Sequence, residues 1–341
     1  MAKLEVGDLE VKGEFVSSEL SFSGLNLYRV LADGTKIAIS EDKANELFTL
    51  PTTVTGQQQY TSNGTYSWLC PSGCYQVSVV AIGGGGAGQD NWANPAGGGA
   101  GLGWKNNISV MPGTTYTVVV GAGGTSTSSG GSANLKGGNS YFRTAQEVAG
   151  MGGGNASGGS ATADGPNSNS SSGGGYVGDG GGAGGHAPNY QGGGGAGGYG
   201  GRGGNGYESQ FPLWNTDLGG AGGGGYYSST YGTGGGGGTG LNGQGAINGS
   251  QPFYNPFTGY NNTNSWGNGG SGRAGGSNGY YGENPFSGTG QSSSNVQGGT
   301  HGGGGGGPGT SWPSASGNGG VGGVRIIWGP PGSRSYPAQA T

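Results

Sequence analysis

The residues that could catalyse a reaction are few and lie far apart in the sequence. Histidine occurs only at His186 and His301, both inside glycine tracts. Gly275-x-Ser277-x-Gly279 has the spacing of a nucleophile elbow, in which a tight strand-to-helix turn presents a reactive serine. In a chain with 95 glycines this match is expected by chance, and no strand-like stretch precedes it and no helix-like stretch follows it. We therefore predict that the protein is not an enzyme.

Cofactor and metal motifs are equally weak. The chain has no Gly-Lys-Ser or Gly-Lys-Thr and so no phosphate loop, and its Gly-x-Gly-x-x-Gly matches lack the surrounding βαβ pattern. The acids of the glycine-rich part are scattered and give no paired carboxylates. They are Asp90, Glu147, Asp164, Asp179, Glu208, Asp217 and Glu283. We expect no catalytic residues, no cofactor and no metal.

Two cysteines, Cys70 and Cys74, flank a Pro-Ser-Gly turn. Zinc needs about four ligands, and only these two are close together in the sequence. Two interpretations stay open. The cysteines are either free thiols in a protein made in a cytoplasm, or they form a disulfide after release from the cell.

Charge and glycine divide the chain into two parts. Residues 1–75 hold 7 of the 95 glycines, whereas 14 of the 28 charged residues lie in the first 50. The net charge is −4 and Lys and Arg are scattered, so the basic cluster that nucleic acid requires is missing. No apolar run is long enough for a membrane helix, and the acid-rich start is unlike a signal peptide. We expect synthesis in a cytoplasm, with no nucleic-acid partner and no membrane insertion.

The N-terminal region, residues 1–56, predicts short strands with one short helix. Leu27–Leu31 and Thr35–Ile39 flank Asp-Gly, a strong hairpin signal. A serine cap precedes the expected helix, Glu41–Phe48. Because short strands are marginally stable alone, we interpret the region as an attachment or oligomerisation segment. It would dock on a larger body or wrap with further copies, a trimer being one option.

Residues 57–124 predict a compact β platform. Tyr75–Ile82 is a strongly β-prone strand that runs into four glycines. A second pair of strands, Asn107–Val110 and Thr115–Val120, is joined by Met-Pro-Gly-Thr. We expect these strands to build a small β-sandwich-like body.

The end of the chain is expected to return to this platform. Residues 321–329 contain the β-prone stretch Val324–Trp328, which should pair with the platform strands. Such pairing would tie both ends of the glycine region to one body. Residues 330–341 are assigned to a C-terminal tail.

The glycine tracts of residues 125–320 repeat every three residues, most clearly over 194–205. A period of three fits neither an α-helix nor a strand, but it fits polyproline II. Bare glycine edges let backbones approach, so each N–H and C=O finds a partner in a neighbouring rod. We interpret 194–205 as one rod in a bundle of polyglycine II helices. The third position of the repeat is Ala196, Tyr199, Arg202 and Asn205.

Two other structures compete with this interpretation. Collagen requires one glycine in three and abundant proline, whereas these tracts are two-thirds glycine and nearly free of proline. Disorder is the stronger competitor, because Gly/Ser-rich chains are usually flexible and fixing glycine costs much entropy. The clean phase of the repeat and the aromatic residues between the tracts favour order.

Aromatic residues gather in the stretches between the glycine tracts. They offer stiff, amphipathic contact surface at low entropy cost, which suits a host-surface glycan or an outer-membrane protein. The alternative is that they cap the bundle and cover its backbone. The candidate receptor-contact residues are Tyr207, Phe211, Trp214, Tyr226, Tyr227, Tyr231, Phe253, Tyr254, Phe257, Tyr260, Trp266, Tyr280, Tyr281 and Trp312.

Several segments resemble phage proteins. Trp68-x-x-Pro71-x-Gly73 with its valine-rich strand and glycine run, and Pro-Gly-Thr-Thr-Tyr-Thr-Val-Val-Val, are similar to the glycine-rich domain of tailed-phage tail and virion proteins. Residues 323–337 resemble the ends of glycine-rich structural proteins of cyanophages. More distantly, the chain is similar to the adhesins of T-even-type long tail fibres. That resemblance implies a polyglycine II sandwich with recognition loops at its ends.

We therefore expect a mainly β fold with almost no α-helix: an attachment region, a β platform and a polyglycine II bundle with aromatic loops. The resemblance implies a structural virion protein, a fibre or adhesin that binds the host surface. A capsid decoration or head-fibre protein with the same fold is the alternative. An ice-binding protein is a remote third, because Tyr199 and Arg202 interrupt the row of small residues that such a protein needs.

Overall fold

The computed structural model divides the chain into two compact units, Met1–Thr53 and Val54–Thr341. In the first unit, β1 (Leu27–Val30) pairs antiparallel with β2 (Lys36–Ile39), so the predicted hairpin is confirmed. The expected helix over residues 41–48 lies outside the described residues. The structure describes residues 27–30, 36–39, 54–88, 96–126, 135–154, 173–187, 192–206, 227–228, 232–233, 235–243, 298–305, 317–330 and 332–337.

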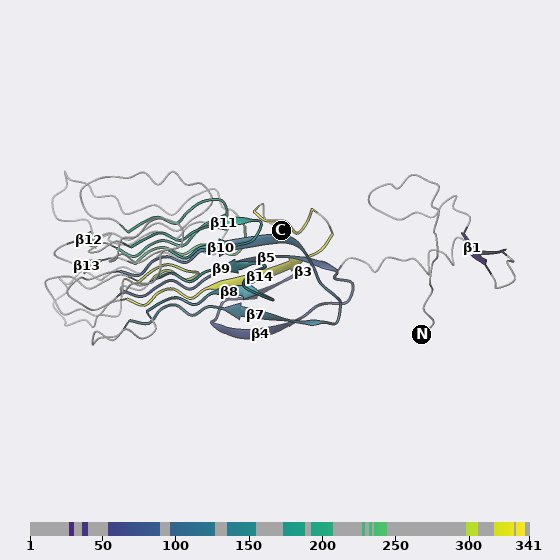
Figure 1. The fold of residues 1–341 in the computed structure, drawn as a ribbon, viewed down its shortest axis with the longest axis horizontal. Helices are drawn as coiled ribbons and strands as arrows, with labels where there is room; N and C mark the ends of the chain where they lie inside the picture. The colour runs from purple at the N-terminus through teal and green to yellow at the C-terminus, as the bar shows by residue number, and fades with distance from the viewer. Residues whose placement is uncertain are drawn as a thin grey trace. The chain divides into compact units, whose positions relative to one another are not determined.

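The second unit contains two five-stranded antiparallel sheets (Figure 1). The first sheet has the order β10-β9-β8-β7-β4, and the second has the order β11-β6-β5-β14-β3. The first sheet comprises β4 (Gly64–Leu69), β7 (Thr115–Val120), β8 (Ser140–Phe142), β9 (Ala149–Gly150) and β10 (Tyr176–Val177). The second comprises β3 (Gly56–Tyr60), β5 (Gln76–Ile82), β6 (Leu102–Ser109), β11 (Gly180–Gly182) and β14 (Gly323–Trp328).

A further pair of strands, β12 (Tyr227–Ser228) and β13 (Gly232–Thr233), forms a small separate hairpin. No helix occurs among the residues that the structure describes. The fold is therefore mainly β, as the sequence predicts.

Side chains of alternate residues pack the two sheets into a sandwich. Val77 and Val79 of β5 face Val118 and Phe142 of the first sheet, and all four are fully buried. The next residue along the strand, Val80, points to the opposite face of the second sheet, into a smaller apolar cluster. The second sheet is thus buried on both faces, which explains why β5 reads as a nearly continuous apolar run.

The last strand, β14, lies inside the second sheet, between β5 and β3. It pairs with β5, with Ile326 opposite Val79, and with β3, with Val324 opposite Tyr60. The expected return of residues 324–328 to the platform is confirmed. The first residue of β14, Gly323, lies opposite Ile82, the last residue of β5.

The expected pairing of Asn107–Val110 with Thr115–Val120 is wrong. These residues belong to β6 and β7, which lie in different sheets, and β7 pairs with β4 and β8 instead. The turn between them carries the chain from one sheet to the other, and Gly113 takes a φ of 75° there. A Pro-Gly turn in the sequence therefore does not distinguish a hairpin from a connection between two sheets.

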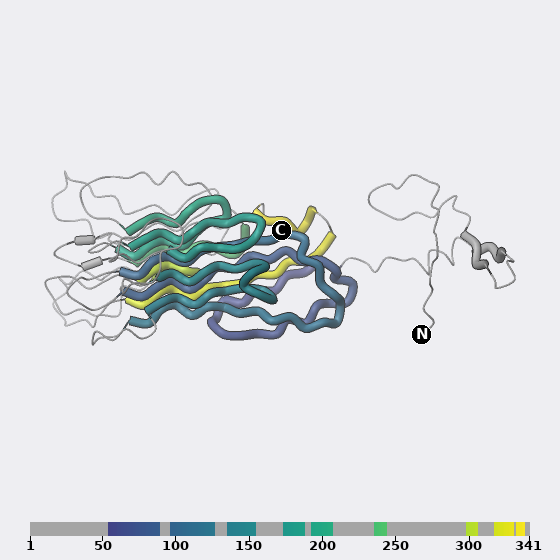
Figure 2. Tube along the Cα trace, in the orientation of Figure 1, coloured from purple at the N-terminus to yellow at the C-terminus, as the bar shows by residue number. Residues whose placement is uncertain are grey.

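The platform and the glycine bundle alternate along the chain. Strands β8 to β11 lie within the range assigned to the bundle, while glycine rods begin already at residues 83–88 and 96–101. The boundary expected near residue 124 therefore does not separate the two. Strands with large side chains form the sandwich, and the glycine stretches that follow or precede these strands form the rods. Figure 2 shows the chain running on from the sandwich into the rods.

Candidate functional site

Residues 83–88 form the central rod of the glycine bundle, and their N–H groups point in turn to three neighbours. Gly83 and Gly86 donate to the rod 96–101, at 3.1 and 2.9 Å. Gly84 and Ala87 donate to the rod 135–138, at 2.9 and 2.7 Å. Gly85 and Gly88 donate to residues 317–320, at 2.8 and 3.0 Å. The direction of bonding repeats every three residues, as in a polyglycine II helix.

The carbonyl groups of the same rod point to three further rods. Gly84 accepts from Gly153, Gly85 from Gly124 and Gly86 from Gly305, at 2.8 to 2.9 Å. The central rod thus has six hydrogen-bonded neighbours. This pattern excludes a β-ladder, in which a strand bonds to two neighbours at most. The predicted bundle of polyglycine II rods is confirmed for the described tracts.

Close approach of the backbones explains why glycine is needed. A Cβ atom added to Gly85 would overlap the carbonyl of Gly303, and one added to Gly99 would overlap the carbonyl of Gly195. Both obstacles are backbone atoms fixed by hydrogen bonds, so neither can move aside easily. At Gly175, by contrast, a Cβ meets no heavy atom within 4 Å. Glycine is therefore a packing requirement inside the bundle and optional at parts of its edge.

The tract 194–205 is two rods and not one, which corrects the sequence-based interpretation. Its chain bends at residues 199–201, and the second half runs back along the first. Gly195 donates to Gly204 at 2.8 Å and Gly198 to Gly201 at 2.9 Å. A uniform triplet repeat carries no signal for the reversal, because glycine can turn at any position.

Tyr199 stands at this reversal and is buried under the second sheet. Its hydroxyl donates to the Gly240 carbonyl and accepts from the Gly243 N–H, each at 3.0 Å. Its ring stacks on Tyr336 at a centroid distance of 5.8 Å. Tyr199, which interrupts the row of small residues in the triplet repeat, therefore anchors the bundle to the sandwich.

The rods end together at the side of the bundle away from the sandwich. Ala87 bonds to Leu135, and the next residue, Gly88, bonds to Gly317. Gly98 likewise bonds to Gly154 at 3.0 Å. These residues lie at or near the ends of the described ranges, and the sequence between those ranges connects one rod to the next.

Thirteen of the fourteen candidate receptor-contact residues lie in such connecting segments, outside the described residues. The exception is Tyr227, whose backbone pairs with Thr233 in the β12–β13 hairpin. Their role in binding therefore stays a prediction. What the structure adds is the place from which their segments start.

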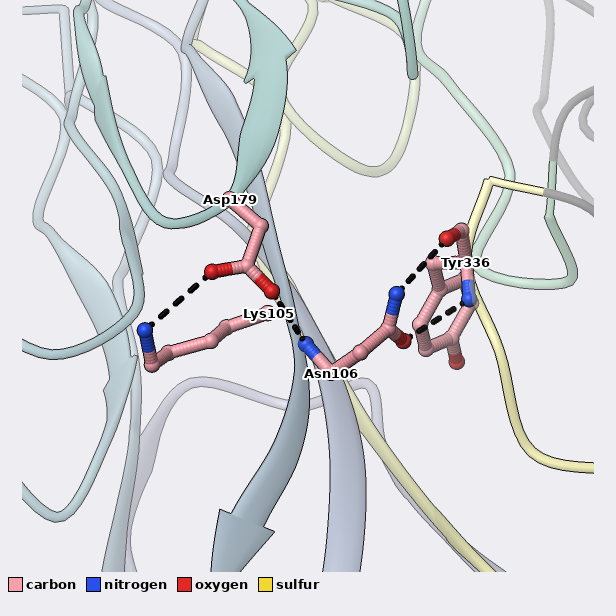
Figure 3. Close-up of polar contacts among 4 residues, drawn as sticks. All are labelled: Lys105, Asn106, Asp179 and Tyr336. Carbon is pink, nitrogen blue, oxygen red and sulfur yellow. Dashed lines mark hydrogen bonds and ion pairs between the residues drawn. The ribbon is translucent and has the colours of Figure 1, made fainter. Parts of the chain in front are cut away.

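Figure 3 shows an anchor for the C-terminal segment that the sequence does not predict. The side-chain amide of Asn106 donates to the Tyr336 carbonyl at 2.8 Å and accepts from the Tyr336 N–H at 2.9 Å. The backbone N–H of Asn106 donates to Asp179 at 2.9 Å, and Asp179 also pairs with Lys105 at 3.2 Å. Residues 332–337 are thus held against the second sheet, within the range that the sequence assigns to a tail.

A β-bulge gives two asparagines access to this segment. The register of β5 with β6 shifts between Val77 and Val79, and Asn107 takes a φ of 52° there. Asn107 accepts a hydrogen bond of 2.7 Å from Arg334. Asparagine tolerates left-handed backbone, and Asn-Asn within an otherwise β-prone stretch was the available signal.

Arg334 is buried without a carboxylate among the described residues. Its guanidinium donates to Gln76, Asn107 and the Gly329 carbonyl at 2.6 to 2.9 Å, and burial lowers its pKa. Neighbouring Tyr199 and Tyr336 have raised pKa values because burial disfavours the phenolate. These groups hold the segment in place.

Cys70 and Cys74 are buried free thiols. The Cys70 thiol donates to the Cys74 carbonyl at 3.2 Å. Burial, with a smaller contribution from Cys70, raises the pKa of Cys74 to about 12. A thiol held protonated in this way is a poor nucleophile, and the disulfide stays a prediction.

No group of three or more His, Cys, Asp or Glu residues that could hold a metal occurs among the described residues. Within the same residues, none of the structure is a helix of the length and apolarity that a bilayer crossing requires. The interactions in the described residues are backbone hydrogen bonds and the packing of side chains. The candidate functional site stays the set of aromatic stretches that the sequence predicts, which join the rods outside the described residues.

The fold and this scaffold define a β-sandwich protein extended by polyglycine II rods. The chain belongs to the family described as glycine-rich domain, which matches residues 61–283. No match to the chain was found among curated proteins.

Proposed function

We propose that the protein is a structural virion protein of a tailed bacteriophage, a fibre or adhesin that binds the host surface. The observation that carries the proposal is the central rod with its six hydrogen-bonded neighbours. Such a bundle is held together by peptide groups, so it needs few side chains for its own stability. The side chains in its connecting segments are then available for contacts with a partner.

The composition of those segments supports a receptor made of sugar or of outer-membrane protein. Residues 207–231 and 251–267 are rich in Tyr, Phe and Trp, with many Asn and Ser residues. Aromatic rings stack on apolar faces, while amides and hydroxyls bond to polar groups. Residues 1–56 would bind other virion proteins and hold the protein on the particle.

Adsorption of particles to host cells tests the receptor claim. A variant with Phe253, Tyr254 and Phe257 changed to serine should bind at least about tenfold fewer cells, a loss of about 1.4 kcal/mol. Tyr75→Ser is the matched control, because Tyr75 is 56% exposed but lies on the sandwich. Equal adsorption by both variants would contradict the proposal.

Particle assembly tests the attachment claim. Deletion of residues 1–50 should abolish incorporation, while the purified remainder keeps its fold. Imaging of labelled protein on intact particles locates it. A position on the tail supports the fibre or adhesin, and a position on the head supports a capsid decoration or head-fibre protein instead.

A further inference from the structure

The edge strands at the two sides of the sandwich differ in length and in charge. On one side lie β10 and β11, of two and three residues, which a short turn joins, so that one continuous segment supplies the edge strand of both sheets (Figure 1). Asp179 in this turn pairs with Lys105 of β6. Short edge strands and charged groups are the usual protection against unwanted strand pairing.

In the described part of the chain, the opposite side has no such protection. Here β3 and β4, of five and six residues, form the edges of the two sheets. Their neighbouring rings Tyr60 and Tyr66 lie 4.9 Å apart, so the two edges run close together. Neither strand contains a charged residue or a proline, and neither pairing with its inner neighbour has a bulge.

The outer backbone groups of these strands have no partner in the described part of the chain. There, β3 pairs only with β14, and β4 only with β7. Gln58 at the middle of β3 and Thr65 and Ser67 of β4 are exposed. A regular, uncharged and exposed edge is a template for another strand.

We propose that a second copy of this chain pairs with this side, β3 of each copy adding to β4 of the other. The strand directions fit such a pair. β3 runs towards the rods, since Tyr60 lies opposite Val324 at the start of β14, whereas β4 runs away from them, since Gly64 lies opposite Val120. Two copies related by a two-fold axis parallel to the strands therefore bring β3 and β4 together antiparallel.

This arrangement completes both edges of both copies. Hydrogen bonds of an edge strand point in the plane of its sheet, and the two-fold axis places each sheet in line with a sheet of the partner. The pair would contain two continuous ten-stranded sheets, because each copy contributes five strands to each. A three-fold arrangement would instead make the sheets meet at an angle and weaken these bonds.

The parallel direction of the two copies rests on the proposed function. Under this two-fold axis both bundles point the same way, as the display of loops to one host surface requires. Pairing β3 with β3 would satisfy the edges but point the bundles in opposite directions. The choice of β3 and β4 as the contact surface does not depend on the proposed function, because it is inferred from these edge strands alone.

Light scattering of the full chain tests the stoichiometry, with an expected mass twice the 33.0 kDa of one chain. Gln58→Lys with Ser67→Lys should weaken the pair at least tenfold, and Gln58→Lys with Ser67→Glu should restore it. Gln146→Lys is the matched control, since Gln146 is exposed on the turn between β8 and β9. A wild-type protein that is monomeric or trimeric would overturn the proposal. So would a Gln58→Lys, Ser67→Lys double variant that stays dimeric.

Cross-linking keeps the test decisive if the lysine variant fails to fold. A mixture of Gln58→Cys and Ser67→Cys chains should form a disulfide-linked dimer on mild oxidation, while Gln58→Cys alone should not. Cross-linking of Gln58→Cys chains to one another would show β3 against β3 and overturn the arrangement. Because neither readout involves host cells, failure of the dimer is distinguishable from failure of the receptor proposal.

Discussion

Asn106 holds Tyr336 by the same two hydrogen bonds that a strand partner would make. Its side-chain amide donates to the Tyr336 carbonyl and accepts from the Tyr336 N–H, at 2.8 and 2.9 Å. One planar side chain therefore satisfies both backbone groups of a residue that belongs to no strand. The Tyr336 ring, 3% exposed, then covers the second apolar cluster.

Removing this amide should loosen the C-terminal segment. Asn106→Ala leaves the N–H and C=O of Tyr336 without their partners, which costs about 1–3 kcal/mol in a buried setting. Denaturant unfolding should show the loss of stability. Hydrogen exchange should show faster exchange at Tyr336, with little change in the rods.

Lys105→Ala is the control for this prediction. Lys105 is adjacent to Asn106 in the sequence, but its ion pair with Asp179 lies at the surface. The exposed fractions of the Lys105 and Asp179 side chains are 35% and 40%. Exposed pairs contribute about 0–1 kcal/mol, so this variant should remain close to wild type. An equal loss in both variants would argue that the Asn106 amide has no special role.

The glycine rods make a sharper prediction. Gly85→Ala places a methyl group against the backbone of Gly303, where no flexible side chain can yield. Overpacking of this kind costs about 1–3 kcal/mol. Urea unfolding should therefore give a lower midpoint for this variant.

Gly175→Ala should behave in the opposite way. A Cβ there has no heavy atom within 4 Å, so the substitution brings no clash. It removes conformational freedom from the unfolded chain, which stabilises by about 0.4–1 kcal/mol. If both alanine variants were equally destabilised, close packing between rods would not be the reason for glycine.

The sequence predicts the rods and the strands but not the path of the chain between them. The triplet repeat and the β-prone stretches Tyr75–Ile82 and Val324–Trp328 are local patterns, and the structure contains both. The reversal at Tyr199 and the sheet crossing at Gly113 depend on which neighbour is available. A run of identical residues carries no information about that choice.

The anchor at Asn106 escaped the sequence analysis for a related reason. Asn106 and Asn107 stand beside another polar residue, Lys105, and their partners Arg334 and Tyr336 lie more than 200 residues away. Nothing local links them. The segment after Trp328 looked like a tail because its partners could be found only in space.

Tyr199 offers a prediction about the junction of rods and sandwich. Tyr199→Phe keeps the ring and its stacking on Tyr336 but removes the hydroxyl that bridges Gly240 and Gly243. The buried Gly243 N–H loses its acceptor, so unfolding should become easier by about 1–3 kcal/mol. Hydrogen exchange at Gly243 should rise more than exchange at Gly85, and equal changes would contradict the bridging role.

Stability should fall at alkaline pH because of Cys74. Its pKa is raised to about 12 in the folded protein, mainly by burial, from an ordinary value of 9.0. Above pH 9 the unfolded chain releases this proton while the folded protein retains it, so the unfolded state binds fewer protons. Linkage then requires stability to be retained below pH 9 and to decline as pH rises from 9 towards 12.

Urea midpoints measured across this range test the assignment. Tyr199 and Tyr336 contribute to the same decline, since burial raises the pKa of each, so the informative quantity is a difference between variants. Cys74→Ala should lower stability at pH 7 through lost packing, yet its stability should decline less steeply between pH 9 and 12. Parallel curves for Cys74→Ala and wild type would show that this thiol is not the titrating group.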